Sequence, residues 1–172
     1  MADPVTERLE DHALEALASP DDDPPGTLAV GLGGQADAQS IVTVIQSHAE
    51  TDEEFAALVA RNDRSGNGIP DRNLDRIYDE LFASPAGAQA ERYLTDDRRG
   101  AQVEYTVEAG ASQAEVSADG AEHAADFRYT ATATGQLVIF DAITQIIFES
   151  AIQGLVLALV LTTVFLIISY AV

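Results

Sequence analysis

Two absences narrow what this protein can be: the chain has no cysteine, and none of its nine basic residues is a lysine. Without cysteine, disulfide frameworks and zinc–thiolate sites are excluded. The nine arginines face 29 aspartates and glutamates, which gives a net charge of -20 at pH 7. Because such a charge repels phosphate, we expect no nucleic acid partner.

An acidic surface without lysine is typical of proteins that fold in near-saturated salt. At such ionic strength the Debye length falls to about 3 Å or less, so repulsion between the carboxylates is screened. The composition therefore predicts a halophilic archaeal source. The alternative interpretation of the charge is a surface that binds cations or a basic partner.

The N-terminal segment, residues 1–25, lacks the basic and apolar regions of a signal peptide. It is acidic and contains prolines, which predicts a flexible segment ahead of an acidic globular domain over 26–135.

A recognisable catalytic set is also missing. The three histidines, His12, His48 and His123, stand isolated in polar contexts, and no serine or acid pair lies beside a plausible base. We therefore do not expect an enzyme.

The C-terminal end carries the longest apolar run. Residues 151–172 (AIQGLVLALVLTTVFLIISYAV) contain no charge, and as a helix they would span about 33 Å, the hydrocarbon thickness of a bilayer. A small domain has no interior that could bury such a helix. Residues 136–150 continue the apolar pattern, so the sequence predicts one long helix over 136–172 that becomes a transmembrane span. Asp141 and Glu149, near the membrane entrance, are candidate substrate-path residues or ordinary interfacial polar groups.

Two segments alternate between apolar and polar residues, AQVEYTVE at 101–108 and FRYTATAT at 127–134, and each predicts a half-buried strand. The alanine-rich stretch 111–126 between them predicts a helix lying flat on a sheet. A strand, a helix and a strand in this order predict a parallel βαβ unit with a right-handed crossover, and hence an α+β fold.

The first half of the domain predicts an apolar strand over 26–34 and a helix over 36–48. A capping box that starts at Thr51 predicts a further short helix, which ends near Arg61.

The segment 63–74 has the spacing of a calcium loop. Gly68 allows the sharp turn, and a second helix over 71–82 follows, with Pro70 at its first turn. Leu74 replaces the bidentate glutamate of the twelfth position, so any Ca²⁺ affinity would be low. The alternative is an Asn-Gly turn before a capped helix. The candidate ligands are Asp63, Ser65, Asn67, Ile69 through its carbonyl, and Asp71.

Three features together carry a resemblance to a known family: the run SGNGIPDRNLDRIYDELF, the predicted βαβ unit, and the run FESAIQGLVLALVLTTVFLIISY. They resemble the resistance-nodulation-division (RND) superfamily of exporters, in particular its haloarchaeal MMPL and Patched-like branch. The resemblance implies a ferredoxin-like porter ectodomain whose last strand runs into a transmembrane helix. It also implies efflux of hydrophobic or amphiphilic substrates by a multi-pass protein of the cell membrane, with the soluble domain extracellular.

Complete exporters of this kind have two repeats of six spans with ion-coupling carboxylates in mid-membrane helices, whereas this chain predicts one span without charge. We therefore expect a piece of an exporter, inactive alone. Its partners would be the lipid bilayer, the remaining transmembrane helices and a second porter domain. The alternative is a tail-anchored, single-span protein whose acidic domain is a cytoplasmic interaction or calcium-responsive module.

Overall fold

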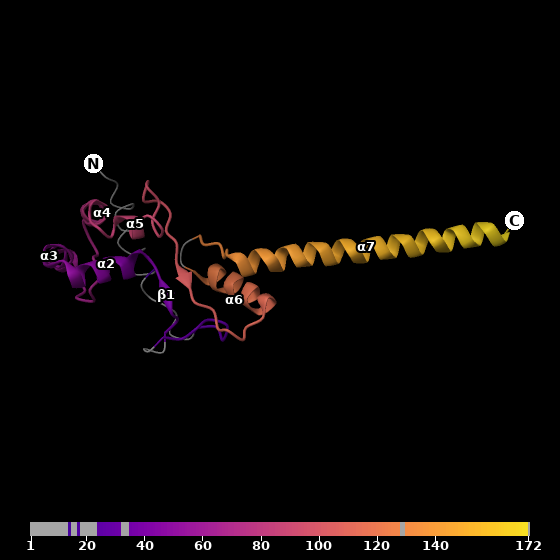
Figure 1. The fold of residues 1–172 in the computed structure, drawn as a ribbon, viewed down its shortest axis with the longest axis horizontal. Helices are drawn as coiled ribbons and strands as arrows, with labels where there is room; N and C mark the ends of the chain where they lie inside the picture. Colours follow the sequence, from indigo (N-terminus) through magenta and orange to yellow (C-terminus); the bar gives the residue numbers. More distant parts are fainter. Residues whose placement is uncertain (1–13, 15–16, 18–23, 32–34, 128–129, 172) are drawn as a thin grey trace. The chain divides into compact units, whose positions relative to one another are not determined.

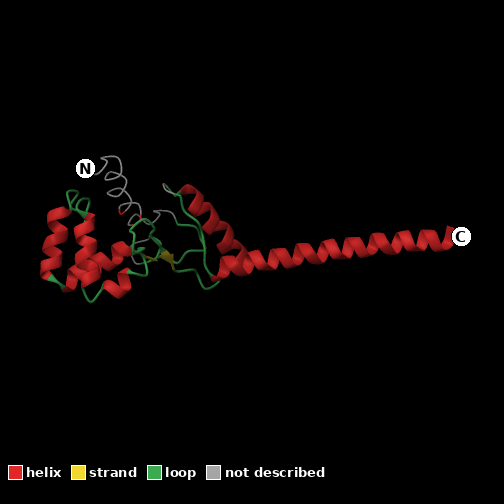
Figure 2. Cartoon of the chain, turned by 90° about the horizontal axis from the view of Figure 1, so that it is seen from above, coloured by secondary structure: helices red, strands yellow, loops and turns green. Residues whose placement is uncertain are grey.

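The computed structural model describes residues 14, 17, 24–31, 35–127 and 130–171. The chain divides into two compact units, Met1–Ala109 and Gly110–Val172. The described residues form mainly helices, with one small two-stranded sheet and a long C-terminal helix (Figures 1 and 2). The prediction of a mixed α and β chain that ends in a long helix is confirmed at this level.

The first unit is built around helices α2 (Ile41–Thr51), α3 (Glu53–Asn62), α4 (Leu74–Ala83) and the short α5 (Gly87–Ala90). The predicted helix over 36–48 is therefore confirmed as α2, although it begins later. Its N-cap is Ser40, whose hydroxyl accepts a hydrogen bond from Val42 N while Thr43 Oγ1 accepts one from Ser40 N.

The predicted cap of α3 is displaced by one residue. Thr51 still belongs to α2, and its hydroxyl donates to the carbonyl of His48. Asp52 is the cap instead, because its Oδ1 accepts from the backbone N atoms of Glu54 at 3.0 Å and Phe55 at 2.9 Å. The carboxylate thereby satisfies two of the donors that the first turn of a helix leaves unpaired.

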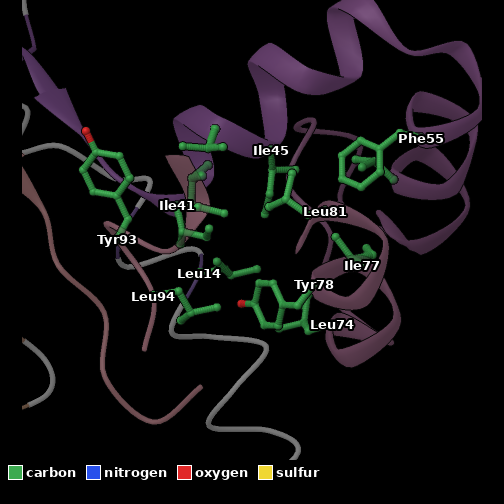
Figure 3. Packing of buried hydrophobic residues seen from close by; sticks show 14 of the residues in the cluster. Leu14, Ile41, Ile45, Phe55, Leu74, Ile77, Tyr78, Leu81, Tyr93 and Leu94 are labelled. Atoms are coloured by element: carbon green, nitrogen blue, oxygen red, sulfur yellow. The ribbon is translucent and has the colours of Figure 1, made fainter. Parts of the chain in front are cut away.

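One hydrophobic core joins the helices of the first unit (Figure 3). The apolar stripes of α2, α3 and α4 all face it, because residues three and four apart share one helix face. The most deeply buried side chains include Ile41, Ile45, Ile77 and Leu81, all with 0% of their surface exposed.

Helix α4 begins three residues later than the predicted start at residue 71. Asn73 adopts a left-handed conformation with φ 50°, so the helix begins at Leu74, and Pro70 is buried ahead of it instead of in its first turn. Arg98 then fixes the exposed side of α4, since its guanidinium bonds the carboxylates of Asp75 and Asp79 and lies over the ring of Tyr78.

The sheet pairs β1 (Ala38–Gln39) with β2 (Glu104–Tyr105) in antiparallel register. The predicted parallel βαβ unit is therefore wrong: 101–108 pairs with a segment before α2, and the described residues of 127–134 form no strand. Most of the described residues of 127–134 are exposed, so this segment has no buried apolar face that would hold it against a sheet. A ferredoxin-like arrangement is not confirmed.

The predicted strand over 26–34 contributes only isolated bridges. Leu28 pairs with Val107, and Val30 pairs with Ala36, while residues 32–34 lie outside the described part.

The second unit contains α6 (Gln113–Asp126) and α7 (Gln136–Ala171). A capping box opens α6, in which Ser112 Oγ accepts from Glu115 N and Glu115 Oε2 accepts from Ser112 N. Helix α6 contacts α7 instead of lying on a sheet, which corrects the role predicted for its alanines. Gly135, with φ 140°, immediately precedes α7 and separates it from the preceding segment.

Candidate functional site

The loop between α3 and α4 is closed at its base by Asn62, which is only 6% exposed. Its Nδ2 donates to the carbonyl of Leu58 at 2.8 Å, and its Oδ1 accepts from Asn73 Nδ2 at 2.7 Å. Its backbone carbonyl accepts from Asp71 N at 2.8 Å. The two ends of the loop are thus held together by the side chain and the backbone carbonyl of one buried residue.

Asp63 organises the inside of this loop. Its Oδ1 accepts from Gly66 N at 2.7 Å and from Ser65 Oγ at 3.0 Å, while its Oδ2 accepts from Gly68 N at 2.8 Å. Desolvation acts to raise the pKa of Asp63, but the hydrogen bonds, led by the one from Gly68, outweigh it and hold the pKa below its ordinary value. The carboxylate is therefore the form that the loop stabilises.

The turn itself depends on two glycines. Gly66 and Gly68 have φ of 73° and 80°, the left-handed region that glycine adopts without a steric penalty. The turn predicted at Gly68 is confirmed. Between the glycines, the Oδ1 of Asn67 accepts from Ile69 N at 2.9 Å, which is an Asx turn.

Asp71 faces back into the loop from its far end. Its Oδ2 accepts from Arg64 N at 2.9 Å, whereas its Oδ1 is buried and has no hydrogen-bond partner. A buried carboxylate oxygen without a partner is costly unless a cation or water meets it. This atom is the feature of the loop that best fits a hard cation.

Few other oxygen atoms of the loop are available to bind a cation. A carboxylate offers about four lone-pair sites, and Asp63 already accepts three hydrogen bonds, so about one site remains for a cation. Among the described residues, no group of three histidine, aspartate or glutamate side chains lies close enough to hold a metal ion. Two hydrogen bonds connect the predicted ligands to one another. The hydroxyl of Ser65 donates to Asp63 Oδ1, and the backbone N of Ile69 donates to Asn67 Oδ1.

The other candidate residues, Asp141 and Glu149, lie on α7. Asp141 is half-buried in the first turns of the helix, and its Oδ2 accepts from Gln145 Nε2 at 3.1 Å. Glu149 is exposed. Eight residues of helix separate them by about 12 Å, so they make no common site.

Helix α7 is long and apolar enough to cross a membrane. The candidate span covers Gln136–Tyr170; its most apolar stretch of 18 residues has a mean hydropathy of 2.6, and none of that stretch is buried. Its 36 residues extend about 54 Å, compared with about 30 Å for the hydrocarbon core of a bilayer. Large apolar side chains are exposed even in the part before residue 151: Ile139, Phe140, Ile143, Ile146, Ile147 and Phe148.

Two contacts that shape the loop region were not predicted from the sequence. One is the pair formed by Asn62 and Asn73, 11 residues apart, and the other is the clamp of Arg98 on α4. A local signal existed only for the second contact, because Asp75 and Asp79 are spaced four residues apart on one helix face.

The chain matches no protein-family model, and comparison with curated proteins and with solved structures gives no significant match.

Proposed function

We propose that this chain is part of a membrane exporter of the RND superfamily, consisting of a porter-type ectodomain and one span. In the complete protein it would contribute to efflux of hydrophobic or amphiphilic substrates. The observation that carries the proposal is the uncovered apolar surface of α7 ahead of residue 151.

The length of α7 makes this surface informative. A bilayer covers about 30 Å of a helix, so about 24 Å of α7 projects beyond it. Ile139 and Ile143 belong to that projection when the span covers 151–172, and they are 54% and 47% exposed. Apolar side chains on the projecting part need a protein partner. Lipid tails do not reach them there, and contact with water is unfavourable for a large apolar surface. Other helices of a larger membrane protein would supply that cover.

The polar residues of this helix suit a substrate path. Glu149 is exposed and close in sequence to Ile146 and Phe148, whose side chains are both 64% exposed. A carboxylate beside large apolar groups matches the mixed character of an amphiphilic substrate. Asp141, which is half-buried, is the second candidate residue for this path.

The proposal rests on α7 and on the motif between residues 65 and 82. It does not rest on a ferredoxin-like arrangement, which the described residues do not form. An extracellular location of the soluble domain and a multi-pass topology are parts of the same proposal.

An accumulation assay in cells that contain the complete native protein tests this function. Deleting the chain should raise the steady-state level of a fluorescent amphiphile, and Glu149→Gln should raise it in part. Glu122→Gln is the matched control, because Glu122 is an exposed glutamate on α6. Unchanged accumulation after deletion would contradict the exporter proposal.

The buried oxygen of Asp71 favours a second candidate, a membrane-anchored module that responds to calcium. Two carboxylates and no acidic twelfth ligand predict a dissociation constant on the order of 0.1 to 1 mM. Calorimetry on the full chain in detergent, at fixed molar KCl, should give a binding heat that the Asp63→Asn, Asp71→Asn double variant lacks. Equal heats from both proteins would show that surface carboxylates only attract counterions.

A further inference from the structure

The exposed turn between α3 and α4 contains an Asn-Gly step, Asn67–Gly68. We propose that Asn67 is a site of intramolecular deamidation, at which the folded loop converts an asparagine into an aspartate or isoaspartate. The inference concerns the chemistry of the chain itself and is independent of the exporter proposal.

The reaction needs only the chain and water. The backbone N of Gly68 attacks Cγ of Asn67 and forms a five-membered succinimide ring. The C–N bond of the side-chain amide breaks, and its nitrogen leaves as ammonia after taking up the proton from Gly68 N. Water then adds to one of the two ring carbonyls, the bond from that carbon to the ring nitrogen breaks, and the nitrogen takes up a proton from the water, which gives aspartate or isoaspartate. No oxidant, metal or cofactor is required.

The loop holds the electrophile in a favourable state. Oδ1 of Asn67 accepts a hydrogen bond from Ile69 N at 2.9 Å, so the side chain turns along the backbone past Gly68. An N–H donor on a carbonyl oxygen stabilises the negative charge that develops there when a nucleophile adds to the carbon. The contact that defines the Asx turn therefore also activates the amide.

The nucleophile is held as well. Gly68 N donates to Oδ2 of Asp63 at 2.8 Å, and a hydrogen bond to a carboxylate increases the electron density on that nitrogen. Residue 68 has no Cβ to hinder the approach, and both Asn67 and Gly68 are exposed to the water that opens the ring. Holding the two reacting groups in one turn lowers the entropic cost of ring closure.

The other asparagines of the chain are arranged differently. The sequence contains only Asn62, Asn67 and Asn73. The amide of Asn62 is buried and bonded at both ends, to the carbonyl of Leu58 and to Asn73 Nδ2. Asn73 is followed by the branched, buried Leu74, whose side chain obstructs its backbone nitrogen. Deamidation should therefore be confined to Asn67.

The product changes the charge of the loop. A carboxylate at residue 67 would join those of Asp63 and Asp71, which raises the number of acidic side chains in the loop from two to three. The loop should therefore attract cations more strongly as the molecule ages and more of its Asn67 is converted.

Peptide mapping by mass spectrometry of the full chain, incubated in detergent and molar KCl at neutral pH, tests the proposal. We expect amide-to-acid conversion and isoaspartate at residue 67, unchanged Asn62 and Asn73, and no conversion in the Asn67→Gln variant, whose longer side chain would need a six-membered ring. A synthetic peptide of residues 60–76 gives the rate without the fold. An intact Asn67 in the folded chain, under conditions that convert the peptide, would overturn the proposal, as would conversion spread equally over the three asparagines.

Discussion

Replacing Asn62 with alanine should destabilise the first unit far more than the same substitution at an exposed asparagine. The substitution removes two side-chain hydrogen bonds, a buried one to the carbonyl of Leu58 and a partly buried one from Asn73 Nδ2. Each is worth about 0.5–1.5 kcal/mol, so the expected loss is roughly 2 kcal/mol.

A loss of that size corresponds to a fall in melting temperature of roughly 10 °C for a unit of about 100 residues. Thermal unfolding of the full chain in detergent and molar KCl, followed by circular dichroism, measures it. Asn67→Ala is the matched control, because it removes an exposed asparagine with one hydrogen bond from the same loop. Equal melting temperatures for the two variants would refute the assignment of Asn62 as the base of the loop.

Three further perturbations test separate features. Asp52→Ala should cost about 1 kcal/mol in denaturant unfolding and Asp52→Asn much less, since asparagine also caps helices; equal losses would show that the cap is not the cause. The lowered pKa of Asp63 means that its contribution to stability is present above the ordinary aspartate pKa of about 4 and is lost as the pH falls through the lower folded-state pKa, so Asp63→Asn should destabilise the chain at pH 7 and progressively less as the pH falls below about 4. Transfer from molar to about 0.1 M KCl, where the Debye length grows to about 10 Å, should lower the melting temperature because 29 acidic groups face nine arginines; an unchanged value would remove the argument for salt adaptation.

The helices could be predicted because their signals are local. Ile41 and Ile45 recur at helical spacing and are both fully buried in α2. The boundaries moved where one residue had two possible roles. Thr51 could cap α3 or end α2, and Asn73 ended the loop in a left-handed conformation that no periodicity reveals.

The strand partners could not be predicted in the same way. Alternation in 101–108 indicates an extended segment with two faces, but it does not specify which segment pairs with it. The observed partner, Ala38–Gln39, is too short to show a pattern of its own. The order of strand, helix and strand suggested that 101–108 pairs with the next predicted strand, 127–134. In the structure Glu104 instead pairs with Gln39, which lies 65 positions earlier (104 − 39).

The candidate loop shows the same division. The spacing of Asp63, Gly68 and Asp71 predicted a turn that gathers oxygen atoms, and the turn is present. The sequence could not show that backbone N–H groups occupy most of the Asp63 carboxylate, or that one oxygen of Asp71 is buried without a partner. Both depend on how the loop closes on Asn62.

The central claim is that other helices cover α7 where it projects from the membrane, and thiol labelling in cells tests it most directly. Because the chain has no cysteine, a single substitution is its only thiol. Ile139→Cys lies 12 residues, or about 18 Å, before the predicted start of the span. Leu161→Cys lies within the span, and Ser112→Cys is an exposed control ahead of α6.

With an impermeant maleimide applied to intact cells, the exporter account predicts labelling of Ser112→Cys and none of Leu161→Cys. Ile139→Cys should be protected in cells and become reactive when the chain is purified alone in detergent. Labelling of Ile139→Cys in cells as fast as that of Ser112→Cys would contradict the account, because the helix would then project uncovered. Failure to label Ser112→Cys until the cells are opened would contradict it as well, and would favour the tail-anchored alternative with a cytoplasmic domain.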